Sequence, residues 1–516
     1  MTSAGCVVAP TVNPTPSRER ICLLTGGGYP YRRDALGGWC RTLVEGLRRF
    51  RFELLTVTDR ELPSAPAYPL PFNVGSSHAV ALGRETARAG RRRPRAPEEA
   101  GEAAALLCRG LLSVDGHGAG EFGDGLRRLA GLTGRPDPLA GVPFTDALIE
   151  AWRERQAGTG SDTTPLPRLS VRDARTAATL LRHALRALAV ELPDAELVHC
   201  VGGTTPLLAA LAGRWRTGVP LLLTEARAPV PRQRPAEDRL SPAVRTVLRR
   251  FRAGVARAGY AEAELIAPLS TYHHGWALEH GALPARLVQV PAGVDPRDYP
   301  GAVELSAAPA VVWAGSGGPD SGLTLVLDAF IEVAAAVPGT VLHLVGVTAA
   351  HEEHCAQRIE RAGLGRTVRL HPLPADPRDR YTAGHVVAHV PGPADPPYRL
   401  VEAMMSGRAV VGVDVGPAGE TLGTTGLLVP PDEPSELAIA IVGLLRDPAR
   451  RRTLGDAARQ RAMSHFTVDR VVRVYGALYT DLAAPPPAPA FELALAVPAP
   501  RTTTPATVRW LTGENR

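Results

Sequence analysis

Three glycine-rich turns contain the residues of this chain best suited to bind a phosphate group. They occupy residues 25–28, 315–322 and 416–420, and each follows a short apolar run typical of a buried strand. Glycine lets backbone N–H groups come close to a phosphate, and the N-terminus of a following helix adds a favourable dipole. Such turns are also common without any ligand. They therefore indicate either phosphate sites or only tight connections between strands and helices.

The basic residues number 58, and all of them are arginine. The absence of lysine excludes a P-loop, a lysine Schiff base and a pyridoxal-phosphate anchor. Glycines 317 and 322 have the P-loop spacing, but Leu323 stands where the lysine belongs. The codon usage of a GC-rich genome explains arginine in place of lysine across the chain. It does not explain a cation that is missing altogether where a mechanism needs one.

Two histidine-containing segments have some features of metal motifs. His351 and His354 flank two glutamates, but Cys355 occupies the second histidine position of an HExxH motif. We therefore expect residues 351–354 to form an exposed helix start, and His273 and His274 to lie on a helix surface. The six cysteines include no CxxC pair, which favours reduced and buried thiols. No metal site is predicted.

The overall composition favours a soluble, cytoplasmic protein. The first twenty residues lack the apolar core of a signal peptide, and acidic residues interrupt the most apolar stretch, at 323–347. A net charge of +6 is small for 516 residues. The arginine cluster at 84–95 has no interleaved aromatic residues, so we expect no nucleic-acid partner. Peripheral attachment to the inner membrane face stays open, without a transmembrane segment.

Short apolar runs alternate with amphipathic helical segments along most of the chain. Runs that are apolar on both faces predict parallel sheets covered by helices on both sides, which is an α/β fold. The expected strands are 21–25, 52–58, 196–201, 220–224, 264–268 and 288–291 in a first series, and 310–313, 340–345, 367–370, 386–390, 409–413 and 427–429 in a second. Two series predict two doubly wound, Rossmann-like domains, each with a ligand crevice at the carboxyl ends of its strands.

Turn-rich residues 296–308 separate the two series. We expect an N-terminal domain over 20–295, a linker at 296–308 and a C-terminal domain over 309–482. Residues 74–141 fit neither series, and we interpret them as a solvated insertion, with an anion- or partner-binding patch as the alternative. Residues 1–19 and the Pro/Ala-rich tail at 483–516 are expected to be disordered.

Both halves resemble known glycosyltransferases. Residues 398–431, YRLVEAMMSGRAVVGVDVGPAGETLGTTGLLVPP, resemble the donor-binding core of glycosyltransferase family 4, the retaining GT-B enzymes. The segments LLTGGGYPYRRDALGGWCRTLVEGL, PLLLTEARAP, GYAEAELIAPLSTYHHGW and VPAGVDP resemble the branch with a DUF3492 N-terminal domain, of the kind found in Pel exopolysaccharide synthesis. The resemblance covers most of residues 20–482. It implies a GT-B fold of two Rossmann-like domains facing each other across a cleft.

The resemblance also implies where a nucleotide-sugar donor binds. In the family an arginine and a lysine clamp the pyrophosphate, whose charge grows as it leaves. These two positions fall on Ser316 and Ser321 here. The first glutamate of the E-x7-E motif, which contacts the sugar, falls on Ala394, and the second, which holds the ribose, is Glu402. The expected donor-binding residues are Gly315, Ser316, Gly317, Ser321, Glu402 and Glu420.

The acceptor side departs from the family pattern as well. Gly26 stands at a glutamate position, Ala226 at the histidine of the TEHG motif, and Ala292 at the asparagine of the NGVD motif. Glu225 is the catalytic candidate that remains. The expected acceptor-side loop contains Thr25, Gly26, Gly27, Gly37 and Gly38.

Two functional hypotheses follow. The first is a hexosyltransferase that moves a sugar from a nucleotide donor, a UDP-sugar, to a glycan or a small acceptor. The second is a catalytically impaired paralogue that acts as a scaffold or regulatory partner of an active glycosyltransferase. Codon bias does not convert cations to serine or histidine to alanine, so the departures favour impaired turnover, whereas family membership favours transfer. Beyond the nucleotide-sugar substrate, no cofactor is expected.

Overall fold

The computed structural model describes residues 19–32, 35–59, 61–63, 65–83, 98–113, 116–132, 139–157, 166–226, 239–301, 308–318, 321–374, 376–391 and 397–484. The expectations for the first eighteen residues, the arginine cluster at 84–95, Ala394 and the tail beyond residue 484 lie outside these ranges. So does the part of the expected linker at 302–307.

The N-terminal half contains a parallel sheet of six strands in the order β3-β2-β1-β4-β5-β6. Strand order reverses between β1 and β4, which pair side by side from Ile21 opposite Leu197 to Thr25 opposite Val201. The central strands are buried along almost their whole length, as two covered faces require. The strands are β1 (Arg20–Thr25), β2 (Arg51–Thr58), β3 (Val74–Ala81), β4 (Leu197–Val201), β5 (Leu221–Glu225) and β6 (Leu265–Pro268).

The C-terminal half contains a second parallel sheet of six strands, in the order β12-β11-β10-β7-β8-β9. Its order reverses between β7 and β10, which pair through Val311 opposite Val386. The strands are β7 (Ala310–Ala314), β8 (Val341–Val345), β9 (Val368–His371), β10 (Val386–His389), β11 (Ala409–Val413) and β12 (Leu427–Val429). The expected α/β class with two doubly wound sheets is confirmed.

Helices cover both faces of the C-terminal sheet. Residues of α9 (Leu323–Ala336), α10 (Ala349–Arg361) and α13 (Pro434–Arg446) share one buried apolar cluster with the strands. Residues of α11 (Tyr398–Met405), α12 (Ala418–Leu422) and α14 (Pro448–His465) belong to another. This second cluster continues into the N-terminal half, so the two sheets share one apolar core.

Two strand predictions are wrong. Residues 288–291 are not a strand; they run beside the sheet after a single bridge between Ile266 and Leu287. Conversely, β3 was not expected, because its sequence VGSSHAVA is polar and glycine-containing. Its position at the sheet edge explains this sequence, since an edge strand is half exposed and needs no continuous apolar run. The other expected strands lie within one residue of their predicted bounds.

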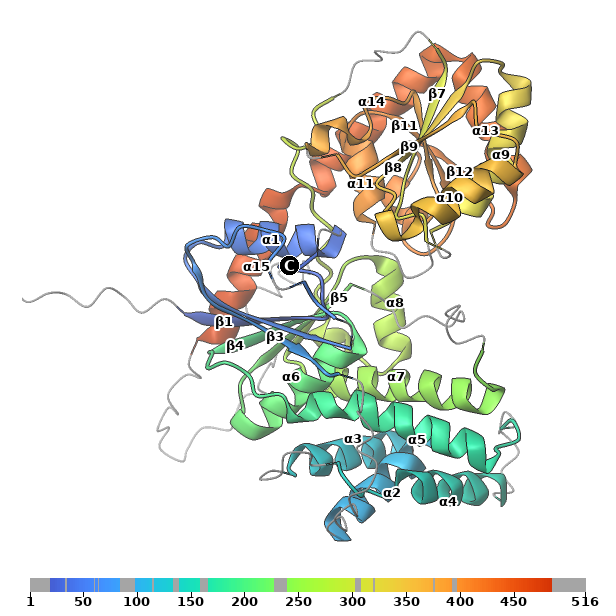
Figure 1. Cartoon of the computed structure of the whole chain (residues 1–516). Coiled ribbons are helices and arrows are strands. Elements are labelled where there is room, and N and C mark those ends of the chain that lie inside the picture. Colours follow the sequence, from blue (N-terminus) through green and yellow to red (C-terminus); the bar gives the residue numbers. More distant parts are fainter. Residues whose placement is uncertain are drawn as a thin grey trace, which may run out of the picture.

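Within the described residues of 98–141, the interpretation of residues 74–141 as a solvated insertion is also wrong. Helices α2 (Glu98–Leu112), α3 (Gly116–Ala130), α4 (Phe144–Ala157) and α5 (Val171–Leu185) share the apolar core of the N-terminal half. Figure 1 shows them as an outer layer beyond α6 (Thr204–Thr217) and α7 (Pro242–Glu262). Their composition misled the prediction because glycine and alanine replace large apolar residues where helices touch. A Cβ on Gly110 would lie 2.3 Å from the backbone nitrogen of Phe122.

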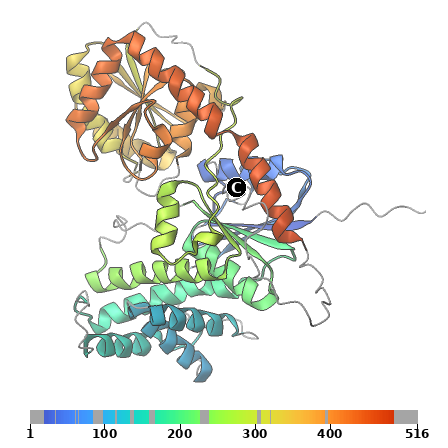
Figure 2. The ribbon, with the colours of Figure 1, turned by 180° about the vertical axis from the view of Figure 1, so that it is seen from behind.

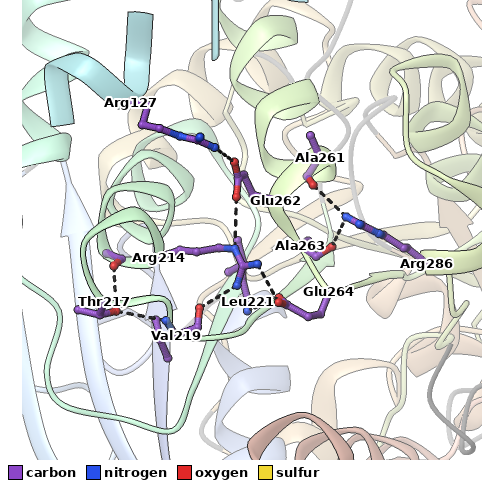
Figure 3. Close-up of polar contacts among 11 residues, drawn as sticks. Arg127, Arg214, Thr217, Val219, Leu221, Ala261, Glu262, Ala263, Glu264 and Arg286 are labelled. Carbon is purple, nitrogen blue, oxygen red and sulfur yellow. Dashed lines mark hydrogen bonds and ion pairs between the residues drawn. The ribbon is translucent and has the colours of Figure 1, made fainter. Parts of the chain in front are cut away.

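An arginine–glutamate network ties this outer layer to the amino ends of β5 and β6 (Figure 3). Glu262, at the end of α7, accepts hydrogen bonds from Arg127 of α3 and from Arg214 of α6, the latter at 3.3 Å. Arg214 also pairs with Glu264 at 2.8 Å. Burial raises the pKa of Glu262, but the nearby Trp215 indole and the Arg127 and Arg214 guanidinium groups outweigh it and leave that pKa below its ordinary value. Arginine suits this position because its planar fork serves several acceptors at once.

The last helix, α15 (Val468–Ala483), leaves the C-terminal half and packs on the N-terminal sheet. Figure 2 shows this red helix running down beside α1 (Ala35–Gly46). An isolated parallel β-bridge between Val294 and Thr467 joins the two halves just before α15 begins. The Trp39 ring meets Tyr475 edge-on at a centroid distance of 5.4 Å, and Phe50 meets Tyr479 at 5.3 Å. The N-terminal sheet is therefore covered partly by the end of the chain.

A buried polar chain lies inside this contact. The Nδ1 atom of His199 on β4 is 2.6 Å from the Tyr479 hydroxyl, and Nε2 is 2.7 Å from Thr224 Oγ1. Thr224 Oγ1 in turn lies 2.7 Å from the Tyr475 hydroxyl. Burial lowers the pKa of His199 to about 3, so its imidazole is neutral in the folded protein.

The neutral state of His199 predicts a pH-dependent stability. In the unfolded chain histidine binds a proton near pH 6.5, whereas in the fold it does so only near pH 3. The unfolded state therefore binds more protons between these values, and stability falls as the pH is lowered through them. From pH 7.5 to 5.5, His199→Gln should remove about 1 kcal/mol of the acid-induced loss in unfolding free energy. Urea titrations at the two pH values measure this. His354→Gln, at an exposed site, is the control; an equal loss in wild type and His199→Gln would contradict the prediction.

Two glycine variants test the packing of α2 on α3. Gly110→Ala places a methyl group against the backbone of α3, which cannot move aside as a flexible side chain would, and should destabilise the protein by about 1–3 kcal/mol. Gly120→Ala meets no atom within 4 Å and should stabilise by about 0.5–1 kcal/mol through helix propensity. Thermal unfolding of both variants gives the signs. Equal shifts in the same direction would mean that the two helices do not touch through Gly110.

Candidate functional site

The glycine-rich turn after β7 is held in shape by helix α10. The Thr348 N–H donates to the Ser316 carbonyl at 3.1 Å, and His351 Nδ1 lies 3.2 Å from the same oxygen. Gly317 has φ +77°, and a Cβ there would lie 2.6 Å from Cys355 Sγ, so only glycine fits. Ser321 closes the turn, since its N–H and Oγ donate to the Gly318 carbonyl at 3.0 and 2.5 Å. The described residues of the turn, 315–318 and 321–322, are therefore held in place at the carboxyl end of β7.

This arrangement changes the interpretation of residues 351–354. Glu352, Glu353 and His354 are exposed on the first turns of α10, as expected. His351 is instead half-buried against the turn, and its ring lies next to Gly318. Among the residues that the structure describes, no group of three His, Cys, Asp or Glu side chains is arranged to hold a metal ion.

An arginine that the motif comparison did not single out lies beside the same turn. Arg399, in the first turn of α11, donates from Nη1 to the Ala314 carbonyl at the end of β7, at 3.3 Å. Its helix is anchored by the buried side chains of Tyr398 and Leu400 on either side of it. The guanidinium group thus lies where the strand order reverses, between β7 and β10.

Glu402 lies two positions beyond Leu400, in a buried ion pair. Its Oε2 accepts hydrogen bonds from Arg380 Nη1 and, at 3.1 Å, from the Tyr381 hydroxyl. Arg380 also donates to the Tyr299 hydroxyl at 3.0 Å. Burial alone would lower the pKa of Arg380, but the neighbouring Glu402 carboxylate has the opposite effect, and the Arg380 pKa is raised. The expected ribose-binding carboxylate is thus oriented and neutralised by its own neighbours.

Glu420 connects the two halves of the chain. Both of its carboxylate oxygens accept from the Thr271 N–H, at 2.8 and 2.9 Å, at the start of α8 (Thr271–Glu279). Because α8 follows β6 and Glu420 follows β11, loops at the carboxyl ends of the two sheets meet here. A carboxylate at a helix N-terminus is favourable through the orphan N–H groups and the helix dipole. Glu420 therefore contacts the N-terminal domain.

The prediction that His273 lies on a helix surface is wrong. Its side chain is fully buried near the start of α8, and Nδ1 lies 2.6 Å from Ser270 Oγ, the residue that caps the helix. Burial lowers the His273 pKa to about 4. The sequence did not reveal this, because burial here comes from the neighbouring loops and not from helical periodicity.

The acceptor-side candidates divide between two elements. Thr25 Oγ1, at the end of β1, donates to the Tyr29 carbonyl at 3.0 Å, and Gly27 has φ +108°. Gly26 lies between them and near Pro206. Gly37 and Gly38 were expected in a loop, but they lie in the first turn of α1. The stretch before them is rich in helix-compatible residues, and α1 begins at Ala35.

Glu225 is the last residue of β5, so it lies at the same carboxyl end of the N-terminal sheet as Thr25. It is buried, and its Oε2 accepts a hydrogen bond from the Tyr260 hydroxyl at 2.7 Å. Burial and the Glu225 charge raise the Tyr260 pKa well above its usual value, so the phenol stays protonated as donor. Next to it, Ala226 is fully buried at the position where the resemblance places a histidine. Glu225 is thus a carboxylate held in place by a neutral donor.

No helix among the described residues has both the length and the apolar character needed to cross a bilayer. The chain shows two family matches. Residues 19–285, more than half of the chain, match the domain of unknown function DUF3492, and residues 308–447 match glycosyl transferases group 1. A curated relative, D-inositol 3-phosphate glycosyltransferase of Kineococcus radiotolerans, is 30% identical over 242 residues. That match spans 40% of this chain and 55% of the relative, about half its length.

Solved structures with the same architecture include three transferases or synthases. Sucrose-phosphate synthase from Thermosynechococcus elongatus has a TM-score of 0.58 at 18% identity, over 90% of this chain and 99% of its own. Anabaena HepE in complex with UDP and glucose has a TM-score of 0.52 at 17% identity, over 90% and 100%. The trehalose-phosphate synthase from Burkholderia vietnamiensis has a TM-score of 0.52 at 13% identity, over 90% and 99%.

These likenesses show a shared GT-B fold, built from two Rossmann-like halves. The two doubly wound sheets and the crossing of α15 between them are consistent with this fold, and so is the family match over residues 19–285. The chain belongs to the DUF3492 family, and its C-terminal half carries a region of glycosyl transferases group 1.

Proposed function

We propose that this protein transfers a sugar from a UDP-sugar donor to a glycan or a small acceptor. One observation carries the proposal: residues 315–318 of the glycine-rich turn are held at the point where the C-terminal sheet reverses strand order, inside the region that matches glycosyl transferases group 1. Doubly wound sheets bind nucleotide ligands at this point. The HepE structure with UDP and glucose supports the choice of donor.

In this proposal the donor lies along the carboxyl end of the C-terminal sheet. The backbone N–H group of Gly317 and the hydroxyl of Ser316 bind the diphosphate. Gly315 and Ser321 shape the turn, since the Gly315 N–H donates to the Val345 carbonyl at 3.0 Å and Ser321 Oγ donates to the Gly318 carbonyl. Glu402, oriented by Arg380, accepts the ribose hydroxyls, since a carboxylate has about four acceptor sites.

On the acceptor side, the Gly26–Gly27 turn and Glu225 line the approach to the donor sugar. Glu420 has an indirect role, because it connects the domain that carries the donor to α8 of the other domain.

A finer assignment belongs to the same proposal. The motifs quoted above resemble retaining enzymes of family 4, in the branch associated with Pel exopolysaccharide. We therefore infer a cytoplasmic enzyme of exopolysaccharide or glycoconjugate synthesis, working at the inner membrane face beside a paralogous glycosyltransferase. The alternative is a scaffold without turnover, and the first experiment below distinguishes it from an active transferase.

Calorimetric titration with UDP and GDP, coupled to release of the nucleotide from the corresponding glucose donors, tests the proposal. We expect UDP to bind with a Kd between about 1 µM and 1 mM, and UDP-glucose to release UDP. Glu402→Gln should weaken UDP binding at least tenfold, because a charged hydrogen bond contributes about 1.5–3 kcal/mol. Glu353→Gln, exposed on α10, is the matched control. Absence of binding and release with both nucleotides would overturn the proposal, and binding without release would support the scaffold.

A second experiment restores the missing cations. The double variant Ser316→Arg with Ser321→Lys should bind UDP about tenfold to a hundredfold more tightly, because two cations then face the diphosphate. Uridine affinity should not change, since uridine carries no phosphate. Unchanged UDP affinity would show that these serines do not occupy the clamp positions of the family.

A further inference from the structure

The strand order of the C-terminal sheet defines where a diphosphate can approach. Neighbouring strands β7 and β10 are connected to helices on opposite sides, so a crevice opens at their carboxyl ends. The chain leaves β7 through Gly315 and enters α11 at Tyr398 after β10. A ligand phosphate at this crevice meets the glycine-rich turn on one side and the N-terminal turn of α11 on the other.

The glycine-rich turn brings no positive charge to this crevice, because its sequence contains one carboxylate, Asp320, and no basic residue. Ser316 and Ser321 are neutral, and Ser321 Oγ already donates to Gly318. His351, beside the turn, is next to the Ser316 carbonyl and Thr348 Oγ1, at 3.2 and 3.0 Å. A leaving diphosphate therefore needs its positive charge from another element.

Arg399 supplies a cation from the opposite side. Its Nη1 donates to the Ala314 carbonyl, one residue before the turn begins, and a guanidinium has five N–H donors in all. No carboxylate within the described ranges forms an ion pair with Arg399. The nearby His389 at the end of β10 stays neutral, because burial and, second, the charge of Arg399 lower its pKa to about 3. The guanidinium is thus a positioned, half-buried charge without an acidic partner in the described structure.

We propose that Arg399 binds the diphosphate of the donor and supplies the charge that the serines at positions 316 and 321 lack. The inference rests on the proposed function and adds a residue to the same site. Arginine forms bidentate hydrogen bonds with phosphate oxygens, and its fork is already oriented here by the Ala314 carbonyl. The residue thereby stabilises the leaving diphosphate from α11 and not from the turn after β7.

Binding of UDP and of uridine to the full-length protein separates this role from a structural one. Arg399→Gln should weaken UDP binding about tenfold to a hundredfold and change uridine binding less than twofold, because only UDP carries the diphosphate. Arg399→Lys should fall between wild type and Arg399→Gln, since the charge remains without the fork. Arg366→Gln is the control, because this exposed residue precedes β9 at the opposite end of the sheet. Ligand-observed NMR measures the weak uridine binding, and thermal unfolding confirms that each variant is folded.

A rescue experiment completes the test. Adding Ser316→Arg and Ser321→Lys to Arg399→Gln should restore UDP affinity to within about threefold of wild type, because cations then return to the same diphosphate. Equal losses of UDP and uridine binding in Arg399→Gln, or unchanged UDP binding, would overturn the role of Arg399 while leaving the proposed function in place. If wild type binds neither UDP nor uridine, both fail.

Discussion

The docking of α15 on the N-terminal sheet is the contact on which the arrangement of the two halves depends. This helix begins beside Phe466 in the C-terminal half and ends against β2 and β4 of the other sheet, and its aromatic residues belong to the apolar cluster that both halves share. His199 and Thr224 give its tyrosines polar partners, which a buried hydroxyl needs. With the helix fixed at both ends, the carboxyl ends of β6 and β11 come close enough for Glu420 to reach Thr271. A site formed by two domains thus depends on one helix outside it.

The sequence predicted the two sheets well because their central strands are buried on both faces and read as continuous apolar runs. The prediction failed where residues are paired or buried without a continuous apolar run. β3 is a polar edge strand, and α2 and α3 touch through glycines such as Gly110, whose small size is invisible to an apolar pattern. Helix α15 lies within the predicted bounds of the C-terminal domain, and its packing on the other domain was not expected, since amphipathic periodicity shows that a face is buried but not which element covers it.

The candidate site was predictable to a similar extent. Motif spacing located the glycine-rich turn and Glu402, because both depend on local sequence next to a strand. It did not reveal that Arg380 pairs with Glu402, that Glu420 turns toward the other domain, or that Arg399 lies beside Ala314. These relations join residues from different elements, and only the folded chain brings them together. The turn after β7 therefore lacks the two cations of the family, but the crevice as a whole still has a cation beside it, Arg399.

The crossing of α15 also has a consequence for the order in which this protein can mature on the ribosome. A domain usually folds as its residues emerge, with the N-terminal one first. Here the face of the first sheet formed by Ile21, Leu23 and Leu197 is completed by residues synthesised more than four hundred positions later than β1. Until those residues emerge, helix α1 covers only part of that apolar face, and the first domain remains incomplete. Assembly of the N-terminal half is thus coupled to completion of the chain, although the sheet itself is encoded in its first half.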